Sequence, residues 1–239
     1  MVEISIKAEE ILDILHLPIT NSMILSLLIL IGFIVFAINY KNKISLTNSV
    51  LNTFVRFCLN TLYSLYESIL GSKAKDLFPL LATIFIFILI SNWMGLLPGV
   101  GSILIGEGHE KFPLFRAPTA DLNTTFALAI IAVFFIQYYG FKYLGFGYLK
   151  KYINLSNPIM FFIGLLEIVS EISKVLSFSF RLFGNIFAGE VLLVVVATLV
   201  PVLASTPFLF LEVFVGLIQA LVFSMLTAVF LSAATAEHH

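Results

Sequence analysis

Residues 157–200 read NPIMFFIGLLEIVSEISKVLSFSFRLFGNIFAGEVLLVVVATLV, a long apolar stretch interrupted by a few charged side chains. From Val175 to Val200 the only formal charges are those of Arg181 and Glu190. A guanidinium keeps its proton at every accessible pH, so its charge has to be accommodated wherever the helix lies. At the centre of a bilayer this costs roughly 2.5–3.5 kcal/mol on insertion scales, which makes Arg181 the first candidate functional residue.

Polar side chains in this stretch recur every three or four residues and therefore share one side of a helix. They are Glu167, Glu171, Lys174, Ser177, Arg181 and Asn185. Such a stripe has to face protein or water when it lies in lipid. It predicts a surface of functional contacts, and buried polar contacts between the chain's own helices are the alternative. Glu190 falls on the opposite face of the helix from Arg181, about 13.5 Å further along its axis.

The composition of the whole chain is that of an integral membrane protein. Of the 239 residues 60% are hydrophobic and 11% are charged, whereas a soluble domain carries about a quarter charged residues. Five stretches without Asp, Glu, Lys or Arg reach the roughly 20 residues that cross the hydrocarbon core; they are Leu17–Tyr40, Leu77–Gly106, Leu122–Phe141, Val191–Leu211 and Val213–Ala236. The net charge of −1 gives no reason to expect a nucleic-acid partner.

These patterns predict an all-α polytopic membrane protein of about six helices that forms a single integral membrane domain over residues 1–239. We expect an outer N-terminal segment (1–21), a span (22–40), an amphipathic surface helix (45–71), spans at 77–97 and 119–141, and two long helices (157–200 and 207–236). The helix over 45–71 has one apolar and one polar stripe, which favours the membrane surface. Packing between the spans is the alternative.

Lysines after the first and third spans predict the orientation of the chain. Lys41 and Lys43 follow the first span, and Lys142, Lys150 and Lys151 follow the third. The positive-inside rule therefore places both loops in the cytoplasm, with the N-terminus outside and the C-terminus cytoplasmic.

The last long helix adds two polar residues, Glu212 and Gln219, which lie two turns apart and close to one face. A buried amide needs hydrogen-bond partners, so Gln219 taken alone predicts an ordinary contact between helices. Gly184 and Ala188 lie one and two turns beyond Arg181, where small side chains let another helix approach closely.

Residues 177–190, SFSFRLFGNIFAGE, closely resemble the arginine-bearing helix of subunit a of F-type ATP synthases. Four further segments resemble the same family in the right order along the chain. They are LPITNS at 17–22, ISNWMGLLPG at 90–99, APTADLN at 117–123 and LIQALVF at 217–223. The resemblance spans nearly the whole chain.

The resemblance implies a non-catalytic stator subunit of a proton-transporting rotary ATP synthase. It implies that this chain lies against a rotating ring of c subunits, each with a membrane-embedded carboxylate, and that peripheral-stalk b subunits and the bilayer are its other partners. Arg181 would attract the ring carboxylate in its ionised form and block leakage between two offset half-channels. The two long helices would be strongly tilted, and their length fits because about 44 residues span roughly twice the hydrocarbon thickness.

The family pattern also assigns roles to further residues of this chain. It implies that Asn185 and Gln219 lie near Arg181, that Glu190 and Glu212 line the outer half-channel, and that Glu167 and Glu171 line the cytoplasmic one. Asp121 and Asn123 would stand at the mouth of the outer half-channel; a helix-capping role for Asp121 is the alternative. We expect no cofactor and no metal, and a multi-pass location in a bacterial plasma (inner) membrane.

Two other classes of function stay open on sequence alone. A secondary transporter also places charges at membrane depth, but it usually has repeated halves, which this sequence lacks. A non-conducting assembly subunit is the second alternative, although it would not need an arginine inside an apolar helix.

Overall fold

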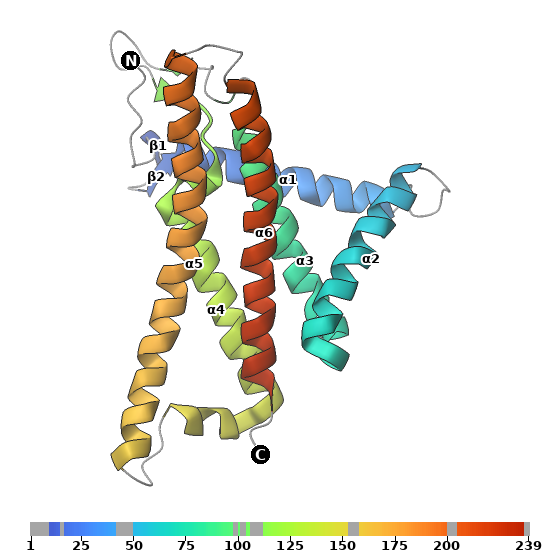
Figure 1. The fold of residues 1–239 in the computed structure, drawn as a ribbon, viewed down its shortest axis with the longest axis vertical. Helices are drawn as coiled ribbons and strands as arrows, with labels where there is room; N and C mark the ends of the chain where they lie inside the picture. Colours follow the sequence, from blue (N-terminus) through green and yellow to red (C-terminus); the bar gives the residue numbers. More distant parts are fainter. Residues whose placement is uncertain are drawn as a thin grey trace.

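The computed structural model describes residues 10–14, 17–41, 50–97, 100, 104–105, 112–152, 158–199 and 205–236. Most of the predicted N-terminal segment (residues 1–9, 15 and 16) lies outside the described residues, as do the terminal residues 237–239. Six α-helices occupy the described part of the chain (Figure 1): α1 Asn21–Asn39, α2 Val50–Leu70, α3 Ala74–Gly95, α4 Leu122–Leu144, α5 Pro158–Leu199 and α6 Ser205–Thr235.

Short elements connect these helices. Three 3₁₀ helices lie at Gly71–Lys73 (η2), Pro118–Ala120 (η3) and Gly145–Lys151 (η4). Two small antiparallel strand pairs were not predicted; they are β1 Glu10–Ile14 with β2 Leu17–Thr20, and β3 Leu104–Ile105 with β4 Phe112–Pro113. Gly145 has a φ of 57°, a value that glycine adopts without strain, and it turns the chain from α4 into η4.

Among the described residues, five helical segments are long and apolar enough to cross a membrane: Asn21–Asn39, Val50–Gly95, Leu122–Leu149, Pro158–Leu199 and Ser205–Thr235. The predicted class, an all-α polytopic membrane protein, is confirmed. Helices α2 and α3 together form one of these segments, Val50–Gly95, because η2 joins them without a break in the helical residues.

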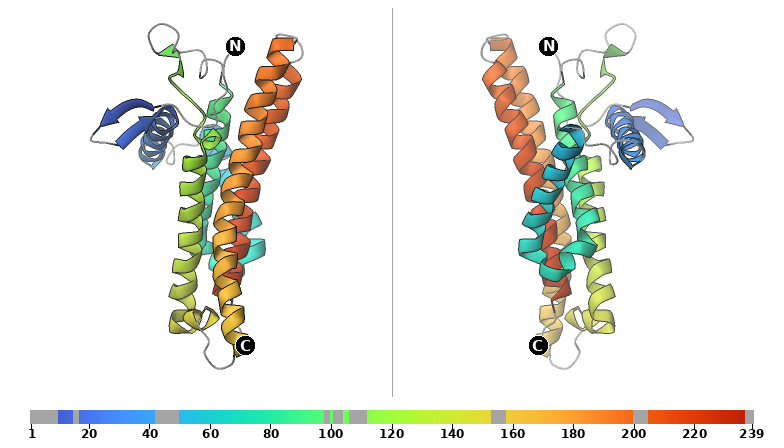
Figure 2. Two further views of the ribbon diagram at one scale, coloured as in Figure 1. Left: turned by 90° about the vertical axis from the view of Figure 1, so that its left-hand side faces the viewer. Right: turned by 90° about the vertical axis from the view of Figure 1, so that its right-hand side faces the viewer.

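The two longest helices, α5 and α6, run antiparallel beside each other, with α4 packed against both and α3 packed against α6 (Figure 1). Helix α1 lies crosswise to this bundle, and it is seen nearly end-on where α5 and α6 stand upright (Figure 2). A helix of 19 residues is about as long as the hydrocarbon core is thick, so it has little room to tilt. If α1 crosses the bilayer directly, α5 and α6 run at a large angle to the membrane normal.

The core lies where α2, α3, α4, α5 and α6 meet. Its largest fully buried side chains include Tyr66, Leu77, Phe178 and Phe223. The rings of Phe178 on α5 and Phe223 on α6 lie 4.8 Å apart between centroids, within the range of favourable aromatic pairs. This pair joins the two long helices near their middle.

Helix α2 packs against α3 and α6 with a face that only partly overlaps the apolar stripe in its sequence. The buried residues are Asn52, Leu62, Tyr66 and Leu70; Leu62 belongs to the apolar stripe, whereas Phe54, on the same stripe, is exposed. The hydroxyl of Tyr66 donates a hydrogen bond of 2.9 Å to Ser224 Oγ on α6. Tertiary contacts with α6 therefore decide which side of α2 is buried, and its position at the membrane surface stays a prediction.

We predict that Tyr66→Ala destabilises the bundle by about 2–4 kcal/mol, because it leaves a cavity and removes the hydrogen bond to Ser224. The readout is the thermal unfolding midpoint of the complex in detergent. The matched control is Phe57→Ala on the same helix, since the Phe57 side chain is 67% exposed. Equal midpoints for the two variants would contradict the packing of α2 described here.

Candidate functional site

Arg181 lies near the middle of α5, and its side chain is exposed on the surface of the bundle. Its Nη2 donates a hydrogen bond of 3.2 Å to Ser177 Oγ, one turn earlier on the same helix. Within the described part of the chain, no carboxylate forms an ion pair with Arg181. Arg181 thus faces away from the chain's own core.

A cleft between α5 and α6 leads along the helix surface to Arg181. Its lining residues are Ser170, Ser173, Lys174, Ser177, Phe178 and Arg181 from α5, and Leu226 and Phe230 from α6. The polar stripe of α5 thus lines an open cleft over much of its length. One wall is polar and the other is apolar.

Asn185 and Gln219 meet directly beyond Arg181. The side-chain amide of Asn185 donates a hydrogen bond of 2.6 Å to Gln219 Oε1. Gln219 is buried, and its Nε2 has no hydrogen-bond partner among the described residues. Since Asn185 follows Arg181 by one helical turn, the structure brings these predicted site residues together.

Glu190 and Glu212 lie in the same region of the hairpin, beyond Arg181. Glu212 is buried, and its carboxyl group lies directly over the Cα of Gly189, where a β-carbon would overlap it. Glu190 follows Gly189 in α5, so two acidic side chains occupy the same part of the α5–α6 interface. One carboxyl oxygen of each, Glu190 Oε2 and Glu212 Oε1, is buried with no hydrogen-bond partner among the described residues.

Two residues near this pair were not predicted as site residues. Arg116, just before η3, is buried and interacts electrostatically with Glu190. Asn92 on α3 is buried; its Nδ2 donates a hydrogen bond of 2.9 Å to the carbonyl of Gly216 on α6, while its Oδ1 has no partner in the described structure. Gly216 lies on α6 between Glu212 and Gln219, so Asn92 stands beside the segment that joins them.

Asp121 caps the N-terminus of α4. Its Oδ1 accepts a hydrogen bond of 3.0 Å from the backbone N–H of Asn123, and its Oδ2 accepts one of 2.5 Å from the Ser22 hydroxyl. Asp121 therefore has the contacts of a helix cap, which was the alternative to a role in the half-channel. Its bond to Ser22 also joins α4 to the start of α1. Asn123 has an exposed side chain.

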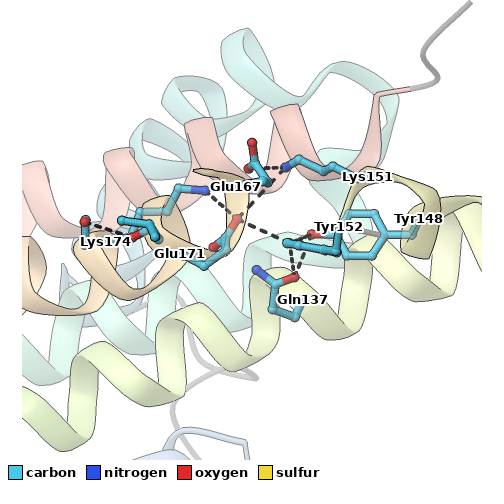
Figure 3. A network of polar contacts seen from close by, with 9 residues as sticks. Gln137, Tyr148, Lys151, Tyr152, Glu167, Glu171 and Lys174 are labelled. Carbon is cyan, nitrogen blue, oxygen red and sulfur yellow. Dashed lines mark hydrogen bonds and ion pairs between the residues drawn. The ribbon is translucent and has the colours of Figure 1, made fainter. Parts of the chain in front are cut away.

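Glu167 and Glu171 lie at the other end of α5 in a network of ion pairs (Figure 3). Lys151 Nζ lies 2.7 Å from Glu167 Oε1 and 4.0 Å from Glu171 Oε1. Lys174 Nζ lies 2.7 Å from Glu171 Oε1. The two carboxylates predicted to line one half-channel are thus paired with lysines, one of which, Lys174, also lines the cleft.

Two tyrosines hold η4 against α4 and α5 (Figure 3). The hydroxyls of Tyr148 and Tyr152 each donate a hydrogen bond of 2.7 Å to Gln137 Oε1 on α4. The Tyr152 hydroxyl also lies 3.4 Å from Glu171 Oε1. Burial raises the pKa of the Tyr152 phenol, so it stays a hydrogen-bond donor at neutral pH. The helical period of the sequence could not predict these contacts. They join η4, a 3₁₀ helix, and the residue after it to side chains on two other helices.

The described residues contain no group of three His, Cys, Asp or Glu side chains placed to hold a metal ion.

The polar side chains fall into three regions along α5. The first is the ion-pair network with η4, the second surrounds Arg181, and the third is the pair of carboxyl groups at Gly189.

Two comparisons relate this chain to known proteins. The family model described as "ATP synthase A chain" matches residues 20–232. A protein of Gloeobacter violaceus named "ATP synthase subunit a" is 38% identical over 221 residues, which cover 92% of this chain and 83% of that protein. Because both matches extend over nearly the whole length, the chain belongs to the ATP synthase subunit a family.

Proposed function

We propose that this chain carries protons through the membrane part of an F-type ATP synthase, at its interface with a rotating c ring, and so couples the ion gradient to ATP synthesis. The observation that carries the proposal is the position of Arg181. A permanent cation lies on the open surface of an apolar helix, with no carboxylate partner among the described residues. A carboxylate on each ring subunit would supply its counter-ion.

The arrangement of polar groups on either side of Arg181 supports two offset half-channels. The cleft from Lys174 to Arg181 would form the cytoplasmic half-channel. The region of Glu190, Glu212 and Asn92 would form the outer one. The ten residues from Glu171 to Arg181 and the nine from Arg181 to Glu190 each correspond to about 14–15 Å of helix, so neither half-channel would cross the membrane by itself.

Arg181 would separate the two half-channels because its guanidinium keeps its proton and cannot relay protons from one side to the other. A ring carboxylate passing Arg181 would lose its proton, since the ionised form pairs with the guanidinium. Protons would then reach one half-channel from the other only by riding on the ring. Each charge that leaked directly through 100 mV would dissipate about 2.3 kcal/mol, which would otherwise be available for ATP synthesis.

The buried carboxyl groups support a proton path on the outer side. Glu190 Oε2 and Glu212 Oε1 have no partner among the described side chains. Buried polar atoms without a protein partner commonly bind ordered water, and hydrated carboxyl groups suit the transfer of protons. Asn92 and Gln219 would extend the same path along α6 towards Asn185.

Of the two alternatives, no structural observation favours a secondary transporter. A non-conducting assembly subunit would leave the exposure of Arg181 and the unpartnered carboxyl groups without a role.

We infer that the chain lies in a bacterial plasma membrane, with its N-terminus outside and its C-terminus in the cytoplasm. Peripheral-stalk b subunits would be further partners.

We predict that Arg181→Ala abolishes ATP-driven proton pumping by the complex in liposomes and raises its passive proton conductance, because the cation between the half-channels is gone. Pumping is followed by the fluorescence of a pH-sensitive dye. Arg56→Ala is the control, because Arg56 lies on α2 outside both half-channels. Pumping by Arg181→Ala at the wild-type rate would overturn the mechanism.

We predict that Gly189→Ala reduces pumping by about tenfold or more, because the added β-carbon displaces the Glu212 carboxyl group. Assembly should be retained, since the side chain at the overlap is flexible. Gly32→Ala is the matched control: a β-carbon at Gly32 on α1 meets nothing within 4 Å. If both variants pump alike, the Glu212 position is not part of the path.

Gly184 tests the partner interface. A β-carbon at Gly184 meets nothing within 4 Å in the chain itself, yet the position lies one turn from Arg181. We predict that Gly184→Val leaves the thermal stability of the isolated subunit unchanged and lowers pumping, because a helix of the ring approaches there. Normal pumping would indicate that the ring contacts a different side of α5.

A further inference from the structure

Four ionisable side chains stand at the end of the cleft that lies furthest from Glu190. Two are carboxylates, Glu167 and Glu171, and two are lysines, Lys151 and Lys174. The lysines come from different elements: Lys174 belongs to α5, whereas Lys151 is supplied by η4, which lies between α4 and α5. The four groups carry two positive and two negative charges, joined by contacts of 2.7–4.0 Å.

The position of Lys151 is set by several independent contacts (Figure 3). Its Nζ lies 5.9 Å and 5.7 Å from the ring centroids of Tyr148 and Tyr152, within reach of a cation–π interaction. The tyrosines are themselves bonded to Gln137. At Gly164 on α5 a β-carbon would overlap the carbonyl oxygen of Tyr152, so α5 lies directly on η4.

The charge balance of this cluster matters because two carboxylates alone attract cations. Rings of Asp and Glu at a channel mouth concentrate cations and select for them. Metal cations gathered here would compete with protons inside the cleft that leads to Arg181. Two fixed ammonium groups remove this attraction without closing the cleft, since Lys174 lies in its wall.

We propose that Lys151 is a specificity-determining residue: held by the tyrosines of η4, it completes a charge-balanced mouth to the cleft and prevents other cations from accumulating there. The claim that this mouth admits protons from the cytoplasm rests on the proposed function above. The charge balance of the mouth does not depend on that function, and it can be measured separately.

The test measures the charge at the mouth with thiol reagents. Cys58, the only cysteine of the chain, is replaced by serine, and Ser170 in the cleft wall is replaced by cysteine. Ser170 lies within one helical turn of Glu167, Glu171 and Lys174. Inverted membrane vesicles containing the whole complex are treated with a cationic reagent, trimethylammonioethyl methanethiosulfonate, or an anionic one, sulfonatoethyl methanethiosulfonate. The ratio of the reaction rate with the cationic reagent to that with the anionic reagent is measured at about 0.1 M salt, where distant charges are screened.

In this background we expect Lys151→Met to raise the rate ratio about threefold or more, because removing one cation near the thiol favours the cationic reagent and disfavours the anionic one. Glu167→Gln should lower the ratio by a similar factor. Lys151→Arg should restore the wild-type ratio, since it keeps the charge. Lys75→Met is the control, because Lys75 is exposed on α3, which packs against α2 and α6.

An unchanged ratio in Lys151→Met would overturn the proposal, and so would an equal change in both reaction rates, which indicates altered packing rather than charge. A ratio that moves as much in Lys75→Met would overturn it as well. If Lys151→Met does not assemble, Glu167→Gln decides alone: the ratio must fall. The rate ratio reports charge whether or not protons pass through the cleft, so its outcome is independent of the pumping experiment on Arg181.

Discussion

Arg181 carries a charge that no accessible pH removes, and its side chain lies on the surface of α5 rather than within the bundle. The helix around it is apolar, so the charge has to be stabilised by water, by Ser177 and by an anion from a partner. The rest of the chain holds the guanidinium in this exposed position. Phe178 and Leu182 pack into the core beside Arg181 and hold the helix with the guanidinium facing outward.

The hairpin of α5 and α6 keeps the polar groups on either side of Arg181 apart. At one end η4 meets α5 and supplies Lys151, which pairs with Glu167, while Lys174 of α5 itself pairs with Glu171. Towards the other end, η3 packs against α5, and Glu212 reaches α5 only because residue 189 has no side chain. Long helices with small residues at the close contacts thus allow acidic groups to be buried at one site and neutralised at another.

The sequence predicted much of the candidate site because its main residues lie on two helices and repeat with the helical period. The helical period placed Arg181 and Asn185 on one side of α5, whereas the neighbourhood of Asn185 and Gln219 was implied by the family resemblance; the two side chains do bond. Other contacts had no such signal. Arg116, Asn92 and Tyr152 lie in a loop, on another helix and after a 3₁₀ segment, and they reach the site through contacts between residues far apart in the chain.

The sequence by itself determined the membrane class, the long helices and the alignment of polar residues on one side of a helix, because hydrophobicity and the helical period are local properties. Only the tertiary structure decided which face of α2 is buried, that Asp121 bonds to Ser22, and that Lys151 pairs with Glu167. Each of these depends on the distance between side chains from separate elements. That distance is set by how the whole bundle packs, and no spacing along one helix encodes it.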